Sequence, residues 1–125
     1  MKRKPLCKTI AGNLCEYLSI TGPSTPEEKS HRKGVFISAR VHPGESNSSY
    51  MMKGAIEFLT SQSPEAELIR NNFVIKVVPM INIDGVINGC YRCSLAGCDL
   101  NRRWKKPNKQ TLPVIYEIKR LCKKF

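Results

Sequence analysis

Two short apolar runs, residues 35–41 and 73–78, most constrain what this chain can fold into. Each is a nearly continuous series of apolar side chains, which is typical of a strand buried on both faces of a sheet. A proline follows each run closely, at Pro43 and Pro79, and ends the strand. The stretch between the runs has room for two helices, and helical crossovers usually join parallel strands. The pattern therefore predicts an α/β fold with a mixed, mostly parallel sheet and flanking helices.

The predicted helices have recognisable starts and apolar faces. A first helix should begin at residues 46–47, and its apolar positions recur at the spacing of one helix face. These positions are Met52, Ala55, Ile56 and Leu59. A second helix has Ser63 as its N-cap and Pro64 at its first position. A last helix opens near residues 111–113 and carries an apolar stripe made of Val114, Ile115, Ile118, Leu121 and Cys122.

The remaining segments predict one more strand and two loops. Residues 14–20 are rich in apolar side chains and predict a strand, whereas residues 22–33 read as a polar loop. Residues 82–111 contain many turn-forming residues and predict one long loop, which in a compact domain is usually functional. The loops after Val41 and Met80 should lie near the carboxyl ends of the buried strands, where α/β proteins assemble their sites.

What the formal net charge of +11 implies about partners depends on where the basic residues lie. They gather in residues 1–8 and 102–125, whereas residues 9–101 are close to neutral. Charge runs at chain ends are usually solvated surface, and the aromatic platforms of single-strand binders are missing. No apolar run approaches the ~20 residues of a membrane-spanning helix. We therefore expect neither a nucleic acid nor a membrane as a partner.

The six cysteines allow disulfides, a zinc knuckle or free thiols. Cys90, Cys93 and Cys98 are one ligand short of a four-cysteine zinc site, and no histidine lies near them in the sequence. The charged start at residues 1–5 is not followed by the apolar segment of a secretory signal. Reduced thiols and a cytoplasmic location are therefore the expectation.

His42 and Glu45 are the first candidate site residues. Pro43 and Gly44 turn the chain tightly between them, so the imidazole and the carboxylate can converge on one metal ion. A catalytic zinc site uses three protein ligands and one open position, and two histidines with one glutamate are one such set. A His-x-x-Glu sequence also has a purely structural interpretation. In that case His42 is hydrogen-bonded and Glu45 caps the following helix.

The predicted long loop carries the second group of candidates. The Asn-x-Asp-Gly sequence at residues 82–85 fits a type I turn. Asn101 and Arg102 offer an amide and a planar guanidinium, which together can hold a carboxylate. Arg92 adds a cation that could polarise a carbonyl oxygen. The alternative is that Arg102, with the basic residues at 103–106, is part of a solvated charge run.

The order and spacing of these motifs resemble the zinc metallocarboxypeptidases. The motifs concerned are His42-Pro-Gly-Glu45, Asn-x-Asp-Gly at residues 82–85, Arg92, and Asp-Leu-Asn101-Arg102. The Ser-Ala-Arg-Val sequence before His42 and the Arg-Cys-Ser-Leu sequence at residues 92–95 look like the cytosolic carboxypeptidases that remove glutamates from tubulin. The resemblance extends over residues 7–121, so residues 1–125 are interpreted as the N-terminal part of a zinc carboxypeptidase catalytic domain.

The resemblance implies a truncated zinc-carboxypeptidase-like fold and a role for each candidate residue. His42 and Glu45 would bind Zn2+. Arg92 would be catalytic and substrate-binding, because it would stabilise the oxyanion of the scissile carbonyl, and Asn101 and Arg102 would hold the substrate's terminal carboxylate. The implied activity is metal-assisted hydrolysis that removes C-terminal or side-chain glutamates from polyglutamylated proteins, such as tubulin in microtubules, in the cytoplasm.

The resemblance lacks two residues that the family needs. A second zinc-binding histidine and a general-base glutamate should follow the Asn-Arg pair, but the one other histidine, His31, precedes it. One hypothesis is a fragment or short isoform of a metallocarboxypeptidase, inactive by itself. The other is a catalytically inactive truncated product that binds acidic tails through Arg92, Arg102 and its basic ends.

Overall fold

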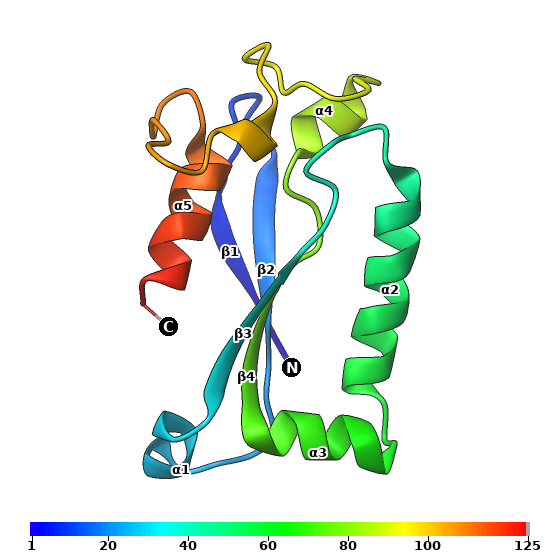
Figure 1. Ribbon diagram of the computed structural model, residues 1–125, viewed down its shortest axis with the longest axis vertical. Coiled ribbons are helices and arrows are strands. Elements are labelled where there is room, and N and C mark those ends of the chain that lie inside the picture. Colours follow the sequence, from blue (N-terminus) through cyan, green and yellow to red (C-terminus); the bar gives the residue numbers. More distant parts are fainter. Residues whose placement is uncertain (125) are drawn as a thin grey trace.

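Four strands pair into one mixed sheet, with helices on both of its faces, in the computed structural model, which describes residues 1–124 (Figure 1). The elements are β1 (Lys2–Lys8), β2 (Leu14–Ile20), α1 (Pro26–Ser30), β3 (Lys33–Ser38), α2 (Ser46–Thr60), α3 (Pro64–Asn72), β4 (Phe73–Val78), α4 (Ile83–Ile87), a 3-10 helix (Leu100–Arg102) and α5 (Pro113–Cys122). The strand order is β1-β2-β4-β3. The mixed α/β class is confirmed, although only the β3–β4 pair is parallel and the other two pairs are antiparallel.

Strand β1, which was not predicted from the sequence, forms one of the two antiparallel pairs. Its consecutive basic residues at 2–4 are exposed, which is typical of solvated surface, and β1 lies at an edge of the sheet, where such residues discourage pairing with other chains. A short turn joins β1 to β2, with the Thr9 N–H donating to the Asn13 carbonyl at 2.8 Å. Gly12 in this turn has a φ of +84°, which favours glycine. A connection this short forces the two strands to run antiparallel.

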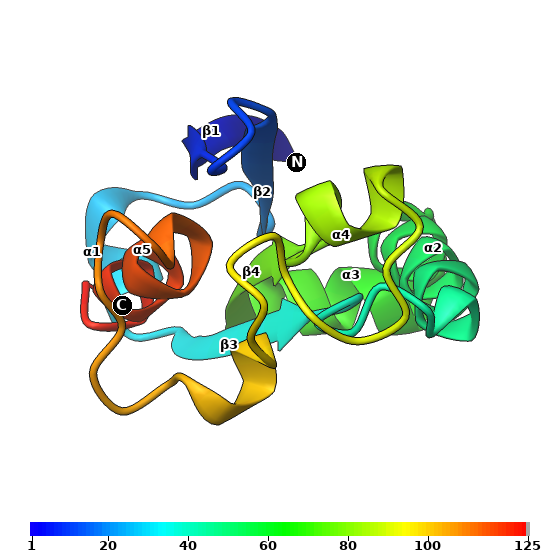
Figure 2. The ribbon, with the colours of Figure 1, turned by 90° about the horizontal axis from the view of Figure 1, so that it is seen from above.

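Two apolar cores lie on opposite faces of the sheet. Figure 2 shows α5 and α2 on opposite sides of the β3–β4 pair. The core beneath α2 contains Ile20, Met52, Leu59, Ile75 and Val77. The core beneath α5 contains Cys15, Val78, Ile81, Leu100, Leu112, Val114, Ile115 and Ile118. Full burial of one such aliphatic side chain contributes roughly 1.5–3 kcal/mol, so these two layers supply the main stabilisation of the fold.

The predicted starts of the helices are confirmed. Helix α2 begins at Ser46 and buries Met52 and Leu59 on its predicted face. Helix α3 begins at Pro64, and the Ser63 hydroxyl accepts a hydrogen bond from the Ala66 N–H at 3.2 Å. Helix α5 begins at the predicted proline and buries the first three residues of its apolar stripe. These starts depend on local capping and periodicity, which the sequence displays directly.

The prediction for residues 35–41 was wrong in its bounds and its burial. Strand β3 ends at Ser38, because Arg40 adopts a left-handed backbone conformation with φ at 56° and breaks the extended chain. The strand is half-buried, because it lies at the other edge of the sheet. The same prediction for residues 73–78 is confirmed, because β4 lies between β2 and β3 and is largely buried.

The two predicted loops contain short helices. Helix α1 lies within residues 22–33, where Thr25 and Glu28 form a capping box. Helix α4 and the 3-10 helix lie within residues 82–111. The predicted type I turn at residues 82–85 is the first turn of α4, with the Asn82 carboxamide oxygen accepting from the Gly85 N–H at 3.1 Å. Asparagine serves turns and helix caps through the same hydrogen bond, so the sequence alone does not separate the two.

Two predictions from the sequence concern the state of the cysteines and membrane-spanning helices. All six cysteines are free thiols in the structure. Within residues 1–124, no helix combines the length and the apolar character that a membrane crossing requires.

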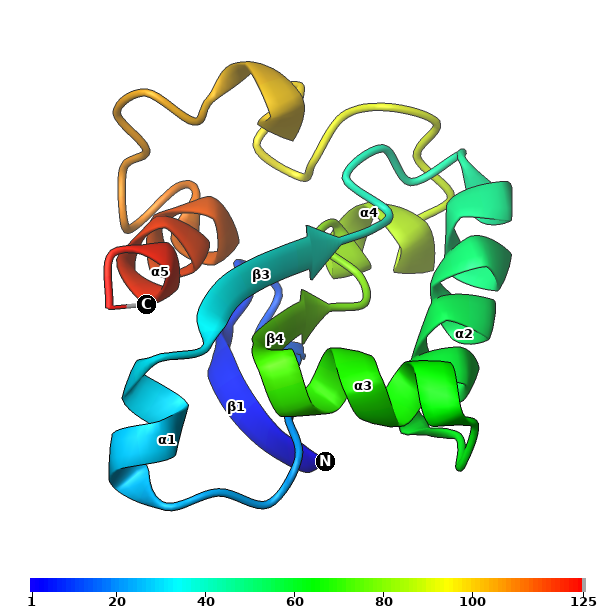
Figure 3. The same cartoon turned by 60° about the horizontal axis from the view of Figure 1, so that its bottom comes forward.

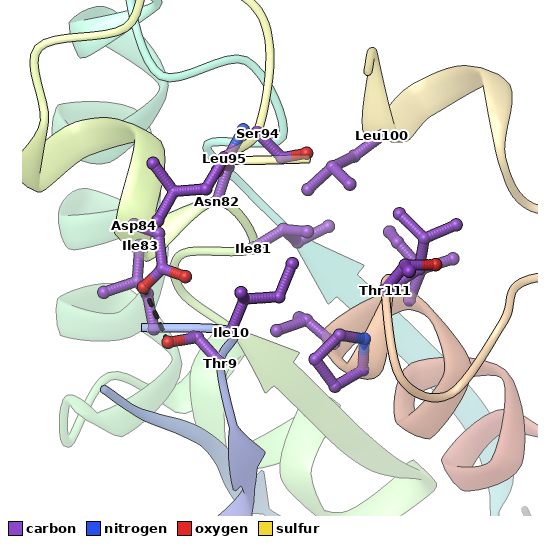
Figure 4. Close-up of a pocket in the computed structure, with 14 residues that line it drawn as sticks. Thr9, Ile10, Ile81, Asn82, Ile83, Asp84, Ser94, Leu95, Leu100 and Thr111 are labelled. Atoms are coloured by element: carbon purple, nitrogen blue, oxygen red, sulfur yellow. Dashed lines mark hydrogen bonds between the residues drawn. The ribbon is translucent and has the colours of Figure 1, made fainter. Parts of the chain in front are cut away.

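Asp84 fastens α4 to the turn between β1 and β2. Its carboxylate accepts hydrogen bonds from the Thr9 hydroxyl at 2.6 Å, the Asn13 side-chain amide at 2.9 Å and the Ala11 N–H at 3.1 Å. Figure 4 shows the contact with Thr9. Burial on its own would raise the pKa of Asp84, but these hydrogen bonds outweigh it and hold the pKa below its ordinary value. The charged carboxylate therefore stabilises the folded chain.

Replacing Asp84 should remove this stabilisation near neutral pH and have less effect in acid. Asp84→Asn should lower the free energy of unfolding near pH 7 by about 1.5–3 kcal/mol, the usual worth of hydrogen bonds to a charged group. A depressed pKa stabilises the fold above the ordinary carboxyl pKa of about 3.9, and this stabilisation is lost as the pH falls through the folded-state pKa. The difference between wild type and Asp84→Asn should therefore shrink below about pH 4, as measured by urea denaturation across the acid range.

Glu57→Gln is the matched control, because Glu57 is exposed and pairs only with Lys53 at 3.6 Å in the described part of the chain. A surface pair of this kind contributes about 0–1 kcal/mol. A pH-independent difference between wild type and Asp84→Asn would show that the carboxylate charge has no part in fastening α4.

Candidate metal centre

Parallel pairing of β3 and β4 continues beyond the strands and brings two loops together (Figure 3). The Ile81 N–H donates to the Ala39 carbonyl at 3.0 Å, and the Asn82 N–H donates to the Arg40 carbonyl at 3.1 Å. The residues that follow β3 therefore lie beside those that follow β4. As predicted, the candidate residues after both strands meet at the carboxyl ends of this pair.

Arg40 fixes the His-Pro-Gly-Glu turn, defined here as residues 42–45. Its side-chain Nε donates to the Pro43 carbonyl at 2.8 Å, and Nη1 donates to the Ser49 hydroxyl at 2.7 Å. The turn is thereby held against the first turns of α2. The left-handed backbone at Arg40 costs about 1–3 kcal/mol, and such conformations cluster at functional sites because surrounding contacts maintain them.

Two glycines permit the close packing of this turn. The Gly44 N–H donates to the Tyr91 carbonyl at 2.7 Å, and a Cβ at position 44 would lie 2.5 Å from Tyr91 Cδ2. A Cβ at Gly85 would lie 2.4 Å from Pro43 Cγ. Such distances are too short for carbon atoms, so the turn fits between α4 and the loop at Tyr91 only when both positions lack a side chain.

His42 lies between two carboxylates. The side chain is buried, its Nδ1 lies 3.0 Å from Glu45 Oε1, and its Nε2 lies 3.0 Å from Asp99 Oδ1. Glu45 is the N-cap of α2, but its side chain makes no capping hydrogen bond. The structural interpretation of the motif therefore fits His42, which is hydrogen-bonded, and fails for Glu45.

Asp99 joins the two groups of candidates, and the sequence analysis gave it no role. Its Oδ2 accepts from Arg92 Nε at 2.9 Å and Nη2 at 2.8 Å, and its Oδ1 accepts from the Asn101 N–H at 2.8 Å. Burial would raise the pKa of Asp99, but the hydrogen bonds from His42 and Asn101 and the charge of Arg92 hold it below its ordinary value. One available signal was that a metal-binding histidine usually needs a carboxylate on its other nitrogen.

The three other candidate residues, Arg92, Asn101 and Arg102, differ in their side-chain contacts. Arg92 is fixed by Asp99, and about half of its side chain is exposed (47%). Asn101 Oδ1 accepts from Trp104 Nε1 at 2.9 Å. Arg102 ends the 3-10 helix, and within residues 1–124 its guanidinium has no hydrogen-bonding or ion-pair partner. The structure thus brings His42, Glu45 and Arg92 together through Asp99 and leaves the Arg102 guanidinium available.

The chain offers two donors to a metal ion at this point. An imidazole nitrogen and a carboxylate oxygen that face each other are the donor types that zinc uses. Within residues 1–124, no group of three histidine, cysteine, aspartate or glutamate side chains is placed to hold a metal. The residues present therefore fit part of a zinc site.

A small cavity beside α4 is separate from this network (Figure 4). It is lined mainly by apolar side chains, among them Ile10, Ile81, Leu95 and Leu100. Its volume is about 30 Å³, which holds a water molecule or two and no substrate. None of the predicted site residues lines it, so it is not the candidate centre.

Comparison with known proteins decides the family. A family model of zinc carboxypeptidases matches residues 1–117. The chain belongs to the zinc carboxypeptidase family. The predicted resemblance is thereby confirmed at the level of the family.

The similar zinc carboxypeptidases include several cytosolic ones. Cytosolic carboxypeptidase 2 of Mus musculus is 53% identical over 125 residues, which are 99% of this chain and 14% of the mouse protein. Cytosolic carboxypeptidase 1 of Danio rerio is 48% identical over 126 residues, covering 96% of this chain and 11% of the zebrafish protein. This chain therefore spans a small part of the relatives that it matches.

A solved zinc carboxypeptidase structure supports the fold. The metallo-carboxypeptidase from Burkholderia cenocepacia superposes with a TM-score of 0.90 and 27% identity, covering 99% of this chain and 33% of that one. Carboxypeptidase A from Helicoverpa armigera, at 20% identity and a TM-score of 0.75, shares the fold over 96% of this chain and 36% of its own. The predicted α/β fold of the zinc carboxypeptidases is thus confirmed.

Adding one methyl group at Gly85 should disturb the candidate centre. In Gly85→Ala the new Cβ would overlap Pro43 Cγ and the Asn82 carboxamide, so we expect a loss of about 1–3 kcal/mol in unfolding free energy, as for overpacked cores. Because Pro43 has to move, the imidazole signals of His42 should shift in NMR spectra.

Gly54→Ala is the matched control, because Gly54 lies in α2 and a Cβ there meets nothing within 4 Å. This variant should gain about 0.5–1 kcal/mol from higher helix propensity, with unchanged His42 signals. Equal effects of the two substitutions would disprove the close packing of α4 on the His-Pro-Gly-Glu turn.

Proposed function

We propose that this chain supplies part of the active centre of a zinc-dependent carboxypeptidase that removes glutamates from polyglutamylated proteins such as tubulin. The observation that carries the proposal is the arrangement of the His42 ring between Glu45 and Asp99. Carboxylates commonly hold the non-ligating nitrogen of a metal-binding histidine, which fixes its tautomer and orientation. The names of the relatives, cytosolic carboxypeptidases, support carboxypeptidase activity and a cytoplasmic location.

His42 and Glu45 would hold the metal. Asp99 faces Nε2 of His42, and a hydrogen bond donated from Nε2 to Asp99 would leave the lone pair on Nδ1, the nitrogen that faces Glu45, for the metal. When bound, zinc polarises a carbonyl group and lowers the pKa of a water molecule for hydrolysis. The packing around residues 42–45 restrains both donors before any metal arrives.

Arg92 would act on the scissile carbonyl of the substrate. Asp99 engages its Nε and Nη2 and so fixes the guanidinium, while Nη1 takes no part in that contact. A donor fixed in this way can stabilise negative charge that develops on an oxygen without first reorganising. The half-exposed side chain also remains accessible to a substrate.

Asn101 and Arg102 would recognise the terminal carboxylate. The free guanidinium of Arg102 has the planar, two-pronged geometry that matches a carboxylate. The Asn101 carboxamide oxygen is engaged by Trp104, which orients the amide so that its NH2 group remains free to donate. The basic residues at 103–106 would favour a substrate with further acidic side chains.

A second candidate function, binding without catalysis, is favoured by the count of metal donors. Residues 1–124 place only two donors at the centre. In this case the chain would bind acidic tails through Arg92, Arg102 and its basic ends, without hydrolysis.

The purified chain should bind zinc weakly and release no glutamate from a polyglutamylated peptide. Two protein donors leave the metal under-coordinated, and the general-base glutamate that the resemblance implies has no counterpart among residues 1–124. Calorimetry with ZnCl2 should show weak binding that His42→Ala abolishes, whereas replacing the exposed His31 should leave it unchanged. Zinc-dependent glutamate release by the pure chain would contradict the two-donor description.

A chimera tests the catalytic proposal. When this chain replaces its matching segment in mouse cytosolic carboxypeptidase 2, the product should release glutamate from polyglutamylated tubulin. Arg102→Ala should then act mainly on KM, because the terminal carboxylate is charged in the ground state and the transition state alike. Loss of one partner of such a pair costs about 2–5 kcal/mol, or tens to thousands of fold in kcat/KM.

Arg92→Ala should instead lower kcat by roughly a hundred- to a thousandfold and nearly keep KM, because its target oxygen becomes negative only during the attack of water. Arg102→Lys should not restore full activity, since an ammonium lacks the two-pronged geometry. Lys53→Ala, at an exposed position of α2, is the control that removes a positive charge elsewhere, and it should resemble the unmodified chimera. Swapped kinetic profiles would refute the two roles, and a folded, zinc-loaded but inactive chimera would refute the proposed function.

A further inference from the structure

A basic cavity lies at the end of the sheet opposite to the candidate metal centre. We call it the lysine pocket, and its charged and hydroxyl-bearing lining residues are Lys2, Lys4, Lys29, Lys76, Ser19, Thr21 and Ser24. Because β2 runs antiparallel to β4, the loop after β2 lies at the amino end of β4, beside α1 (Figure 1). The volume of about 450 Å³ is within the range of ordinary small-molecule sites, roughly 300–1,000 Å³.

The strand register places the lysines on one face of the sheet. Lys2 is paired with Ser19, and Ser19 is paired with Lys76, so the three residues form one row across β1, β2 and β4. Lys4 is two residues from Lys2 and therefore lies on the same face. Helix α1 adds Lys29 from the side. Four ammonium groups, from strands β1 and β4 and from helix α1, thus border one cavity.

Lys76 is an unusual residue for its position in an inner strand. Its β4 neighbours Val74, Ile75, Val77 and Val78 are buried. The Lys76 ammonium donates to the Ser19 hydroxyl at 2.9 Å and lies 5.4 Å from the centre of the Tyr17 ring. Burial, followed by the charges of Lys29 and Lys4, lowers the pKa of Lys76. An anion in the cavity would offset both effects.

The wall of the pocket is fixed in advance. Arg32 Nη1 donates to the Thr21 hydroxyl at 2.7 Å and to the Gly22 carbonyl at 2.9 Å, and Nη2 donates to the Pro23 carbonyl at 3.0 Å. The Gly22 N–H donates to the Arg70 carbonyl at 2.8 Å. The loop that borders the cavity therefore needs little ordering when a ligand binds, and this raises affinity.

The charged side chains that line the pocket in the described part of the chain are all basic. Within residues 1–124, no aspartate or glutamate lines the cavity. Glu16 of β2 pairs with Arg3, and both alternate with the lining residues of their strands, so they lie on the other face of the sheet. Like charges gathered around one cavity repel one another and attract a multiply charged anion.

We propose that the lysine pocket binds a compact, multiply phosphorylated small molecule. Lysine binds phosphate as a point charge, and the Ser19 and Ser24 hydroxyl groups can donate to the remaining phosphate oxygens, whereas the Thr21 hydroxyl already donates to the Phe73 carbonyl at 3.0 Å. A closely spaced polyphosphate can reach several ammonium groups at once within this volume. An extended glutamate tail advances about 3.5 Å per residue and would place few carboxylates inside the pocket. The inference is independent of the proposed hydrolysis.

Inorganic tripolyphosphate is the probe, added to the purified chain in a calorimeter and in NMR titrations. We expect saturable binding that shifts the amide signals of Ser19, Thr21 and Lys76. The double variant Lys2→Gln/Lys4→Gln removes two exposed charges from an edge strand and should weaken binding about tenfold, since each exposed ammonium contributes about three- to fourfold. The control, Lys53→Gln/Lys109→Gln, makes the same change in net charge at exposed positions that do not line the pocket, and should stay within about twofold of wild type.

Circular dichroism should confirm that each variant is folded, and Lys29→Gln on α1 serves if the β1 variant is not. Equal weakening by the control pair would overturn the proposal, because binding would then follow net charge alone. Absence of saturable binding would overturn it as well. Tighter binding of a polyglutamate peptide or of single-stranded RNA at the same residues would replace the proposed ligand class with another.

Discussion

Parallel pairing of β3 with β4 is the constraint on which the rest of the molecule depends. The ladder brings together two chain segments that diverge through α2 and α3, and it continues through Ile81 and Asn82 after both strands have ended. Every predicted site residue follows one of these two strands. A shift of register by one residue would turn the apolar set of β4 towards the wrong core and would separate the two loops.

Two carboxylates, Asp84 and Asp99, hold the segments that follow β3 and β4 in fixed positions. Asp84 fastens α4 to the turn after β1, and α4 in turn supports the His-Pro-Gly-Glu turn through Gly85. Asp99 reaches the same turn from the opposite side and connects His42 to Arg92. Both are charged groups that hydrogen bonds hold below their ordinary pKa in spite of burial. The fold and the candidate site therefore depend on the same class of interaction.

What the sequence revealed was mainly local. Helix starts could be predicted from Ser63 and Pro64, and the site motifs from the order of a few polar residues, because these signals lie within a few positions of one another. The role of Asp99 depends on contact with His42, 57 residues away, which no local pattern reports. Strand β1 and the half-burial of β3 depend on strand order, and this is decided by the whole sheet.

The backbone conformation of Arg40 affects the choice of substitutions when this chain is redesigned. Its φ of 56° is a conformation that glycine adopts without cost, so a ranking of substitutions by backbone preference would select glycine at this position. Glycine, however, has no guanidinium to donate to the Pro43 carbonyl and the Ser49 hydroxyl. A substitution that raises the melting temperature could therefore loosen the geometry needed for chemistry, so thermal screening by itself would reward the wrong variant.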